Sequence, residues 1–153
     1  MADRIYSLDE IQDRLAIADL YDRQLAAAEA FDFEAYDTTF SADALVDLSD
    51  FGLPECPYPR YRAWLADLQG VMVKAQRIIG GLRLQLGDGH ATTRVPVSCH
   101  VVMRSDEHDT LTHTGIFYND VLERRAEGWR IVKRIEELGW SAEDPNDRGE
   151  MGP

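Results

Sequence analysis

The second half of the chain carries four β-rich runs separated by short polar segments, and this pattern constrains the fold more than any other feature. The runs occupy residues 76–86, 91–103, 111–125 and 128–138. The segments between them, such as residues 87–90 and 126–128, are typical of turns between adjacent antiparallel strands. The sequence therefore predicts a four-stranded antiparallel meander. Pro96 has no backbone N–H to donate, which predicts an edge position or a bulge in the second run.

The first half of the chain is predicted to be mostly helical. Ser7 and Glu10 have the spacing of a capping box, which marks the start of a helix. Apolar residues then recur at spacings of three and four, which predicts a long amphipathic helix over residues 7–30: Leu8, Ile11, Leu15, Ala18, Tyr21, Leu25 and Ala28. Asp32 can cap a short second helix. Helical spacing within residues 61–75 predicts a third helix, based on Trp64, Leu65, Leu68, Val71 and Met72.

The order of the predicted elements indicates the fold class. Residues 44–48 predict a short strand, and three prolines in residues 54–59 predict a loop with little regular structure. Helices followed by a meander indicate an α+β fold, whose sheet has one apolar face that the helices must cover. A sheet curved around the helices would leave a cone with an open mouth, where ligand pockets form readily. We expect one domain over residues 1–140 and a polar tail over residues 141–153.

Charge and cysteine usage narrow the classes of partner. The chain has 153 residues and a formal net charge of −12, which disfavours nucleic acid and anionic membranes because phosphate attracts a basic surface. Neither the two cysteines, Cys56 and Cys99, nor the four histidines have the spacing of a metal or redox motif. No glycine-rich loop leads into a helix, as nucleotide binding would require. With no signal peptide or apolar span, we expect a cytoplasmic protein without a metal or cofactor.

The last run places an arginine and a carboxylate on one face of a strand. Counting alternately from Trp129, one face carries Arg130, Val132, Arg134 and Glu136, and the other face is mostly apolar. Charged side chains among apolar ones indicate one of two situations. Either that face is exposed to solvent, or it lines a pocket in which the charges have a function.

The order of these motifs resembles the SnoaL-like branch of the NTF2-like superfamily. The resemblance is carried by residues 17–52, with a tyrosine-bearing first helix and an aromatic second helix, and by residues 117–134, with a Gly-Trp-Arg-Ile strand. It implies an NTF2-like α+β fold, in which a curved antiparallel sheet, or cone, wraps three N-terminal helices around an internal pocket. It also implies a homodimer. The activities of this superfamily are diverse, so the fold by itself decides little about function.

The resemblance also implies catalytic positions. In dehydratase and dehydrohalogenase members, an aspartate late in the first helix orients a histidine that removes a proton, and an arginine on the last strand stabilises the leaving group. Here Glu29 occupies the aspartate position and Arg134 the arginine position. The histidine position holds Arg77, whose guanidinium stays protonated and cannot act as a general base. A structural alternative is a Glu29–Arg77 salt bridge in place of the usual pair.

Two residues are candidates for the missing base. The register of the family suggests that His100 faces inward together with Ser98 and Val102, and histidine titrates near neutral pH. Glu29 is the other candidate, because an apolar pocket would raise its pKa unless an arginine lowered it again. Each has a structural alternative: His100 as a satisfied core histidine, and Glu29 as an exposed residue at a helix end.

Four further residues are candidates for substrate binding, namely Tyr21, Asp47, His113 and Tyr118. The hydroxyl of Tyr118 could donate to a substrate oxygen, although aromatic residues in strands usually belong to the core. Structural alternatives exist for the arginines as well. Arg134 could pair with Glu136 or another neighbour across strands, and Arg77 could lie on the surface.

Together these features favour a cofactor-independent lyase or dehydratase that uses acid–base chemistry. The expected substrate is a small, hydrophobic, oxygenated molecule, aromatic or polycyclic, that loses water or a hydroxymethyl-type group. An isomerase or a polyketide-type cyclase of the same fold is an alternative, and its product would have the mass of its substrate. A non-catalytic ligand-binding domain or accessory subunit is another, and the lost histidine favours it.

Overall fold

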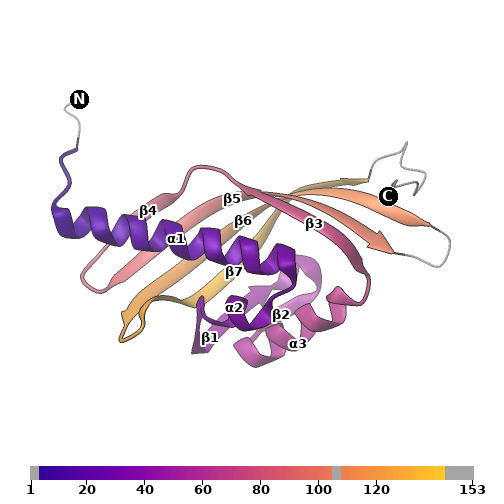
Figure 1. Ribbon diagram of the computed structural model, residues 1–153, viewed down its shortest axis with the longest axis horizontal. Helices are drawn as coiled ribbons and strands as arrows, with labels where there is room; N and C mark the ends of the chain where they lie inside the picture. Colours follow the sequence, from indigo (N-terminus) through magenta and orange to yellow (C-terminus); the bar gives the residue numbers. More distant parts are fainter. Residues whose placement is uncertain (1–3, 105–107, 144–153) are drawn as a thin grey trace.

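Three helices lie against the inner face of one curved sheet (Figure 1). The computed structural model describes residues 4–104 and 108–143, and within these ranges the sheet has seven strands. The elements in chain order are α1 (Leu8–Ala30), α2 (Phe33–Asp37), β1 (Phe40–Leu48), η1 (Ser49–Phe51), β2 (Leu53–Pro57), α3 (Tyr58–Gln69), β3 (Met72–Ile79), β4 (Arg83–Leu86), β5 (His90–Arg104), β6 (Asp109–Arg125) and β7 (Gly128–Glu143). The predicted α+β cone is confirmed.

The first helix begins and ends where the sequence predicts. The hydroxyl of Ser7 accepts from the backbone N–H of Glu10 at 3.2 Å, and the Glu10 carboxylate accepts from the N–H of Ser7 at 3.0 Å. At the other end Phe31 takes a left-handed conformation, with φ of 54°, and this ends α1 after Ala30. Asp32 caps α2 by accepting from the N–H of Ala35, as expected.

The strand order is β2-β1-β7-β6-β5-β3, with β4 paired to β5 beyond the end of β3. The meander predicted in the second half is confirmed, because β5, β6 and β7 pair in sequence as antiparallel neighbours. The first half adds two strands at one end of the open sheet, of which β1 pairs with β7 in parallel. The sheet is therefore mixed, whereas the sequence predicts an antiparallel one.

The structure corrects the predictions between residues 53 and 75. The proline-rich segment is not a loop, because residues 53–57 form β2, which lies at the edge of the sheet and so tolerates Pro54 and Pro57. Pro59 lies in the first turn of α3, where a missing N–H costs nothing. The third helix therefore covers residues 58–69, and the residues from Met72 onward form β3.

The first predicted run, residues 76–86, is divided into β3 and β4 by three residues, and Pro96 lies opposite this gap. The N–H of Gly80 donates to the carbonyl of Pro96 at 2.8 Å. The N and O of one strand residue point to the same side, so the missing N–H of Pro96 faces the gap and no ladder bond is lost. Pro96 thus lies in an interior strand, at a break in the neighbouring one.

The end of the chain differs from the expected polar tail at residues 141–153. Residues 141–143 belong to β7, and residues 144–153 lie outside the described residues. Among the residues that the structure describes, no helix has the length and apolar character needed to cross a membrane.

Candidate functional site

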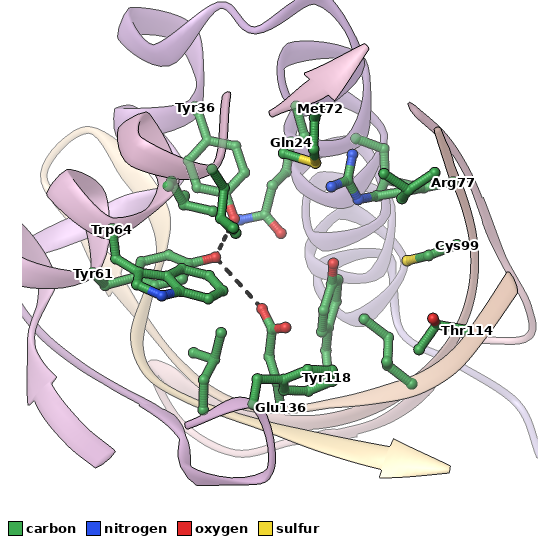
Figure 2. A pocket seen from close by; sticks show the side chains of 18 of the residues that line it. Gln24, Tyr36, Tyr61, Trp64, Met72, Arg77, Cys99, Thr114, Tyr118 and Glu136 are labelled. Carbon is green, nitrogen blue, oxygen red and sulfur yellow. Dashed lines mark hydrogen bonds between the residues drawn. The ribbon is translucent and has the colours of Figure 1, made fainter. Parts of the chain in front are cut away.

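A cavity of about 180 Å³ lies between the helices and the inner face of the sheet (Figure 2). Its walls are largely apolar, with aliphatic side chains and seven aromatic residues, namely Phe31, Phe33, Tyr36, Phe51, Tyr61, Trp64 and Tyr118. A few polar side chains interrupt them, namely Gln24, Arg77, Cys99, Thr114 and Glu136. An apolar hollow with a few converging polar groups is the usual form of a small-molecule site.

Strand register places three of the polar residues in one row across the sheet. Arg77 on β3 is paired with Cys99 on β5, and Cys99 is paired with Thr114 on β6. All three face the cavity. Burial raises the pKa of the Cys99 thiol to about 11, so this side chain is neutral at physiological pH. Arg77 brings a permanent positive charge to the same wall.

Glu136 faces the cavity from β7, directly opposite Tyr118 on β6. Its Oε1 accepts from the hydroxyl of Tyr61 at 3.4 Å, and the Tyr61 hydroxyl lies 2.9 Å from that of Tyr36 (Figure 2). Burial raises the pKa of Glu136 above its ordinary value, and the nearby charges of Arg134 and Arg77 only partly oppose this. Glu136 is therefore a carboxyl group that can exchange protons closer to neutral pH.

Gln24 reaches the cavity from α1. Its Nε2 donates to the hydroxyl of Thr39 at 2.8 Å, and that hydroxyl donates in turn to the carbonyl of Tyr36 at 2.7 Å. Because the Thr39 hydroxyl donates its only proton to the Tyr36 carbonyl, its oxygen can only accept from the Nε2 of Gln24. This fixes the orientation of the amide and leaves its Oε1, which is buried and has no hydrogen-bond partner among the described residues, at the cavity wall.

Behind the cavity wall lies a fully buried ion pair. Arg134 donates from Nε and Nη2 to the two carboxylate oxygens of Asp120, at 2.9 and 2.7 Å, and both side chains are inaccessible to solvent. The hydroxyl of Tyr21 donates to Asp120 at 2.6 Å and lies 2.6 Å from that of Thr93. The Arg134 guanidinium stacks 3.8 Å from the ring centroid of Tyr118, so it supports a wall residue without lining the cavity itself.

Comparison with known proteins identifies the family. The family model of the SnoaL-like domain matches residues 9–135. The chain belongs to the SnoaL-like family. Uncharacterised proteins of Mycobacterium tuberculosis and Mycobacterium bovis are 29% identical to it over 130 residues, which cover 85% of this chain and 88% of theirs.

Solved structures share the NTF2-like fold. The type 3 hexachlorocyclohexane dehydrochlorinase of Novosphingobium barchaimii has a TM-score of 0.79 at 19% identity, covering 91% of this chain and 94% of that one. A protein of Novosphingobium aromaticivorans named as a candidate scytalone dehydratase has a TM-score of 0.75 at 12% identity, covering 88% of this chain and 89% of that one. A Kribbella flavida protein has a TM-score of 0.78 at 21% identity, with coverage of 86% and 94%. At these identities the likeness concerns the fold.

The SnoaL-like cavity brings together two of the residues proposed from sequence. Arg77 and Tyr118 both line it. Tyr21 and Arg134 are buried in the ion-pair network behind it, so neither projects into the cavity as the sequence suggested for Arg134. The alternative of a cross-strand ion pair describes the placement of Arg134 correctly, with Asp120 as its partner.

Glu29 has a different position from the one expected of a SnoaL-like catalytic acid. Its side chain is exposed at the end of α1, and its Oε1 accepts from the backbone N–H of Arg77 at 2.7 Å. The carboxylate is thus held by the backbone of β3, and the proposed Glu29–Arg77 salt bridge is absent from the ion pairs among the described residues. Glu29 fixes the end of α1 against β3, and so helps to position the strand that carries Arg77.

The expectation that His100 faces inward is wrong. Its neighbours Cys99 and Val101 line the cavity, so alternation along β5 turns His100 to the outer face. There its Nδ1 lies 2.8 Å from Nδ1 of His113, the residue opposite on β6. The two histidines form a partly buried cross-strand pair on the far side of the sheet, and neither lines the cavity.

Asp47 is also outside the cavity wall. Its carboxylate accepts from the hydroxyl and the backbone N–H of Ser49, at 2.6 and 2.8 Å, and these bonds lower its pKa. It therefore stabilises the turn that follows β1. Within the described residues, no cluster of three or more histidine, cysteine, aspartate or glutamate side chains is arranged to hold a metal ion.

Sequence reasoning missed several residues of the site, chiefly Gln24, Tyr36, Tyr61, Cys99 and Glu136. A signal existed for Glu136, because it shares a strand face with Arg134 and the sequence pattern marks that face as unusual. The tyrosines of α2 and α3 gave no such signal, since nothing in the sequence shows that these helices close over the sheet at this point.

Proposed function

We propose that this SnoaL-like protein is a cofactor-independent lyase of the dehydratase type, in which Glu136 moves the proton. One observation carries the proposal. Among the described residues, Glu136 is the one carboxylate that lines the aromatic cavity, and burial raises its pKa. A carboxylate in such surroundings is a stronger base than an exposed one, and general bases work best when their pKa lies near the working pH.

The proposed reaction is a proton-balanced elimination. The Glu136 carboxylate takes a proton from a carbon beside an activating carbonyl group or ring. The electron pair of the broken C–H bond forms a C=C bond while the C–O bond to a neighbouring hydroxyl breaks. The leaving hydroxyl receives the same proton from Glu136 and departs as water, so one carboxyl group serves both steps and is regenerated. The hydrogen bond from Tyr61, 3.4 Å from Oε1, orients Glu136 for this work.

Arg77 and Tyr118 are suited to stabilise the negative charge that develops on the activating oxygen. Arg77 is permanently charged, and burial raises the pKa of Tyr118 well above its ordinary value, so Tyr118 stays a neutral hydrogen-bond donor. Figure 2 shows both side chains pointing into the same hollow as Glu136. Preorganised donors of this kind are among the largest contributions to enzymatic catalysis.

The size of the cavity and the names of similar structures agree with this class of reaction. A cavity of roughly 150 Å³ can hold benzene, so about 180 Å³ suits a substrate with one substituted ring. A dehydrochlorinase and a candidate dehydratase share the fold, and both names denote eliminations. We therefore propose a small, ring-containing, hydroxylated carbonyl compound as the substrate.

The experiment compares Glu136→Gln with Glu137→Gln. Glu137 is the next residue in β7 but is paired with Arg94 outside the cavity, so it is a matched control. A panel of hydroxylated cyclic ketones is incubated with each protein, and products are detected by mass spectrometry as compounds lighter by one water. Glu136→Gln should lower turnover about 10²–10⁴-fold, and Glu137→Gln should leave it unchanged.

Three outcomes would contradict the proposal. Full activity of Glu136→Gln would exclude this residue as the base. A product with the mass of its substrate would indicate an isomerase or a cyclase. Binding of ring compounds without turnover of any of them would indicate a ligand-binding domain.

A further inference from the structure

Two buried polar atoms without partners face the cavity, one a donor and one an acceptor. They are Nη1 of Arg77 and Oε1 of Gln24, and neither has a hydrogen-bond partner within the described part of the chain. Buried polar groups are nearly always paired, and leaving one unpaired costs about 1–3 kcal/mol. Two such atoms in the wall of one cavity indicate that a ligand satisfies them.

The charge of Arg77 is not neutralised by the residues around it. The Glu29 carboxylate accepts a hydrogen bond from the backbone N–H of Arg77 and makes no ion pair with the guanidinium among the described residues. Cys99 is paired with Arg77 across the strands, and its thiol is neutral. Glu136 interacts with Arg77 electrostatically, but no ion pair joins the two among the described residues. Strand register places the guanidinium at the cavity wall beside the Cys99 thiol, and its Nη1 is left without a hydrogen-bond partner among the described residues.

The unpaired oxygen of Gln24 has a fixed orientation. The Thr39 hydroxyl must accept from Nε2 because its own proton goes to the carbonyl of Tyr36, so the amide cannot flip without losing a buried hydrogen bond. Gln24 therefore presents an acceptor to the cavity, and a ligand hydroxyl or N–H can donate to it. Figure 2 shows the Gln24 amide and the Arg77 guanidinium on the same side of the hollow.

From these atoms we infer that the cavity binds a small aromatic monocarboxylate bearing a hydroxyl group, with its carboxylate against Arg77 and its hydroxyl near Gln24. The planar guanidinium fork matches a carboxylate, and the ring of such an acid fits between aromatic walls such as those of Tyr61 and Trp64. The chain as a whole has a net charge of −12, so its overall field repels anions and the attraction has to come from this one site.

The inference rests on the proposed function and deepens it, because it names the class of substrate on which Glu136 would act. Such a substrate carries its hydroxyl on a saturated carbon beside the C–H bond that Glu136 breaks, and hydroxybenzoates, whose hydroxyl is on the ring, serve as non-reacting probes of binding. Binding and turnover can nevertheless fail separately. If the acid binds but nothing is dehydrated, the inference stands and the proposed function falls. If a neutral hydroxyketone is dehydrated and the acids do not bind, the reverse holds.

The experiment measures affinities by titration calorimetry with ligand pairs that differ in one group. Benzoate is compared with benzamide, its neutral counterpart, and each hydroxybenzoate with the corresponding methoxybenzoate, which lacks the donor. Benzoate should bind roughly ten- to a hundredfold more tightly than benzamide, since a hydrogen bond to a charged group gives this advantage. At least one hydroxybenzoate should bind more tightly than its methoxy counterpart.

Arg77→Met should abolish the preference for benzoate over benzamide. The variant keeps the backbone N–H that Glu29 accepts from, so the contact between α1 and β3 is retained. Arg83→Met, which removes an exposed arginine of β4, should leave all affinities unchanged. Glu136→Gln should bind benzoate at least as tightly as the wild type, because it removes a negative charge from the cavity.

Equal affinities for benzoate and benzamide in the wild type would overturn the inference. So would a preference that survives in Arg77→Met, or a folded wild type that binds none of the acids. If every hydroxybenzoate binds no better than its methoxy counterpart, the role given to Gln24 is wrong. Because the ligand pairs are compared in the wild type first, the outcome does not depend on the folding of any variant.

Discussion

The guanidinium of Arg134 and the carboxylate of Asp120 make two parallel hydrogen bonds across β7 and β6, at 2.9 and 2.7 Å, with no exposure to solvent. The next inward-facing pair in this ladder is Tyr118 and Glu136, which line the cavity. A buried ion pair of this kind fixes the register of the two strands, because a slip by one residue would leave both charges unpaired. The pair thus holds Tyr118 and Glu136 in place.

Asp120→Asn should therefore be strongly destabilising. It leaves Arg134 buried without a countercharge, and breaking one side of a buried pair typically costs about 3–5 kcal/mol. Urea denaturation measures this change. The control is Glu55→Gln, which removes one side of an exposed pair with Lys133 and should cost at most about 1 kcal/mol. A loss below about 1 kcal/mol for Asp120→Asn would show that the pair does not fix the ladder.

Glu136→Gln should stabilise the protein, and the gain should depend on pH. Burial raises the folded-state pKa of Glu136, so below its unfolded pKa the carboxyl is protonated in both states and the substitution changes little. Between the pKa that Glu136 has in the unfolded chain and its higher pKa in the folded protein, the carboxyl ionises in the unfolded chain but stays protonated in the folded one. The wild type therefore loses stability as the pH rises through this range, whereas the variant, which has no carboxyl there, does not. We expect the variant to be more stable by about 0.5–2 kcal/mol at pH 8.

The measurement is the free energy of unfolding of both proteins between about pH 4 and pH 8. The difference between them isolates Glu136, because the carboxyls of Glu10, Asp43, Asp47 and Glu137, whose pKa values are lowered, are present in both. A difference that is constant with pH, or that favours the wild type at the upper end of this range, would contradict the prediction. It would mean that the positive charges of Arg134 and Arg77 lower the pKa of Glu136 at least as much as burial raises it.

The first helix shows how far periodicity carries a prediction. Its bounds follow from the capping box and the apolar spacing, but the spacing alone does not reveal where the helix meets the sheet. Leu8 and Leu15 fit the predicted stripe yet are 77% and 61% exposed, whereas Ile17 and Leu20 are fully buried. Burial depends on which part of α1 the sheet covers, and that is a property of the tertiary structure.

Leu20→Ala and Leu15→Ala should accordingly differ in cost. Leu20→Ala opens a cavity in the core and should lower the free energy of unfolding by about 2–5 kcal/mol. Leu15→Ala removes exposed surface and should change it by less than about 0.5 kcal/mol. Thermal or urea denaturation of both variants tests this. A cost above about 1 kcal/mol for Leu15→Ala would show that this part of α1 is covered in solution.

The candidate site could be predicted only in part, for reasons that lie in register and packing. Alternation along the last strand identifies Arg134 and Glu136 as charged residues on one strand face. The resemblance to the family identifies Arg77 as the residue at the position of the catalytic histidine. The facing of His100 depends on strand register, where a shift of one residue exchanges the two faces. Gln24 and Tyr61 enter the site because α1 and α3 cross the sheet there, and no local pattern encodes such a crossing.

Cys99 should be nearly inert toward thiol reagents in the native protein. Burial raises the pKa of its thiol to about 11. At pH 8 only roughly one molecule in a thousand would then carry the reactive thiolate, against about a quarter for an ordinary cysteine. In Cys56→Ser, where Cys99 is the one remaining thiol, Ellman's reagent should react at least about a hundredfold more slowly than it does after unfolding in urea. Comparable rates in the two states would mean that solvent and reagent enter the cavity freely.

The outer face of the sheet leads to the last prediction, which concerns assembly. Ile78 and Trp140 are 55% and 53% exposed there, and together with Pro96 and Phe117 they line a shallow apolar hollow. A Cβ at Gly115 would overlap the Trp140 indole, so the glycine lets this ring lie flat against the sheet. Contiguous exposed apolar surface of this kind commonly marks an interface. Since the resemblance to the family implies a homodimer, we expect a second copy to cover this face.

Trp140→Glu should then convert a dimer into a monomer, because it places a charge in the centre of the apolar hollow. Sedimentation velocity on the wild type and the variant measures the change. Leu15→Glu, which adds the same charge at an exposed leucine of α1, should leave the assembly unchanged. If the wild type is monomeric, or if Trp140→Glu remains a dimer, this face is not the interface.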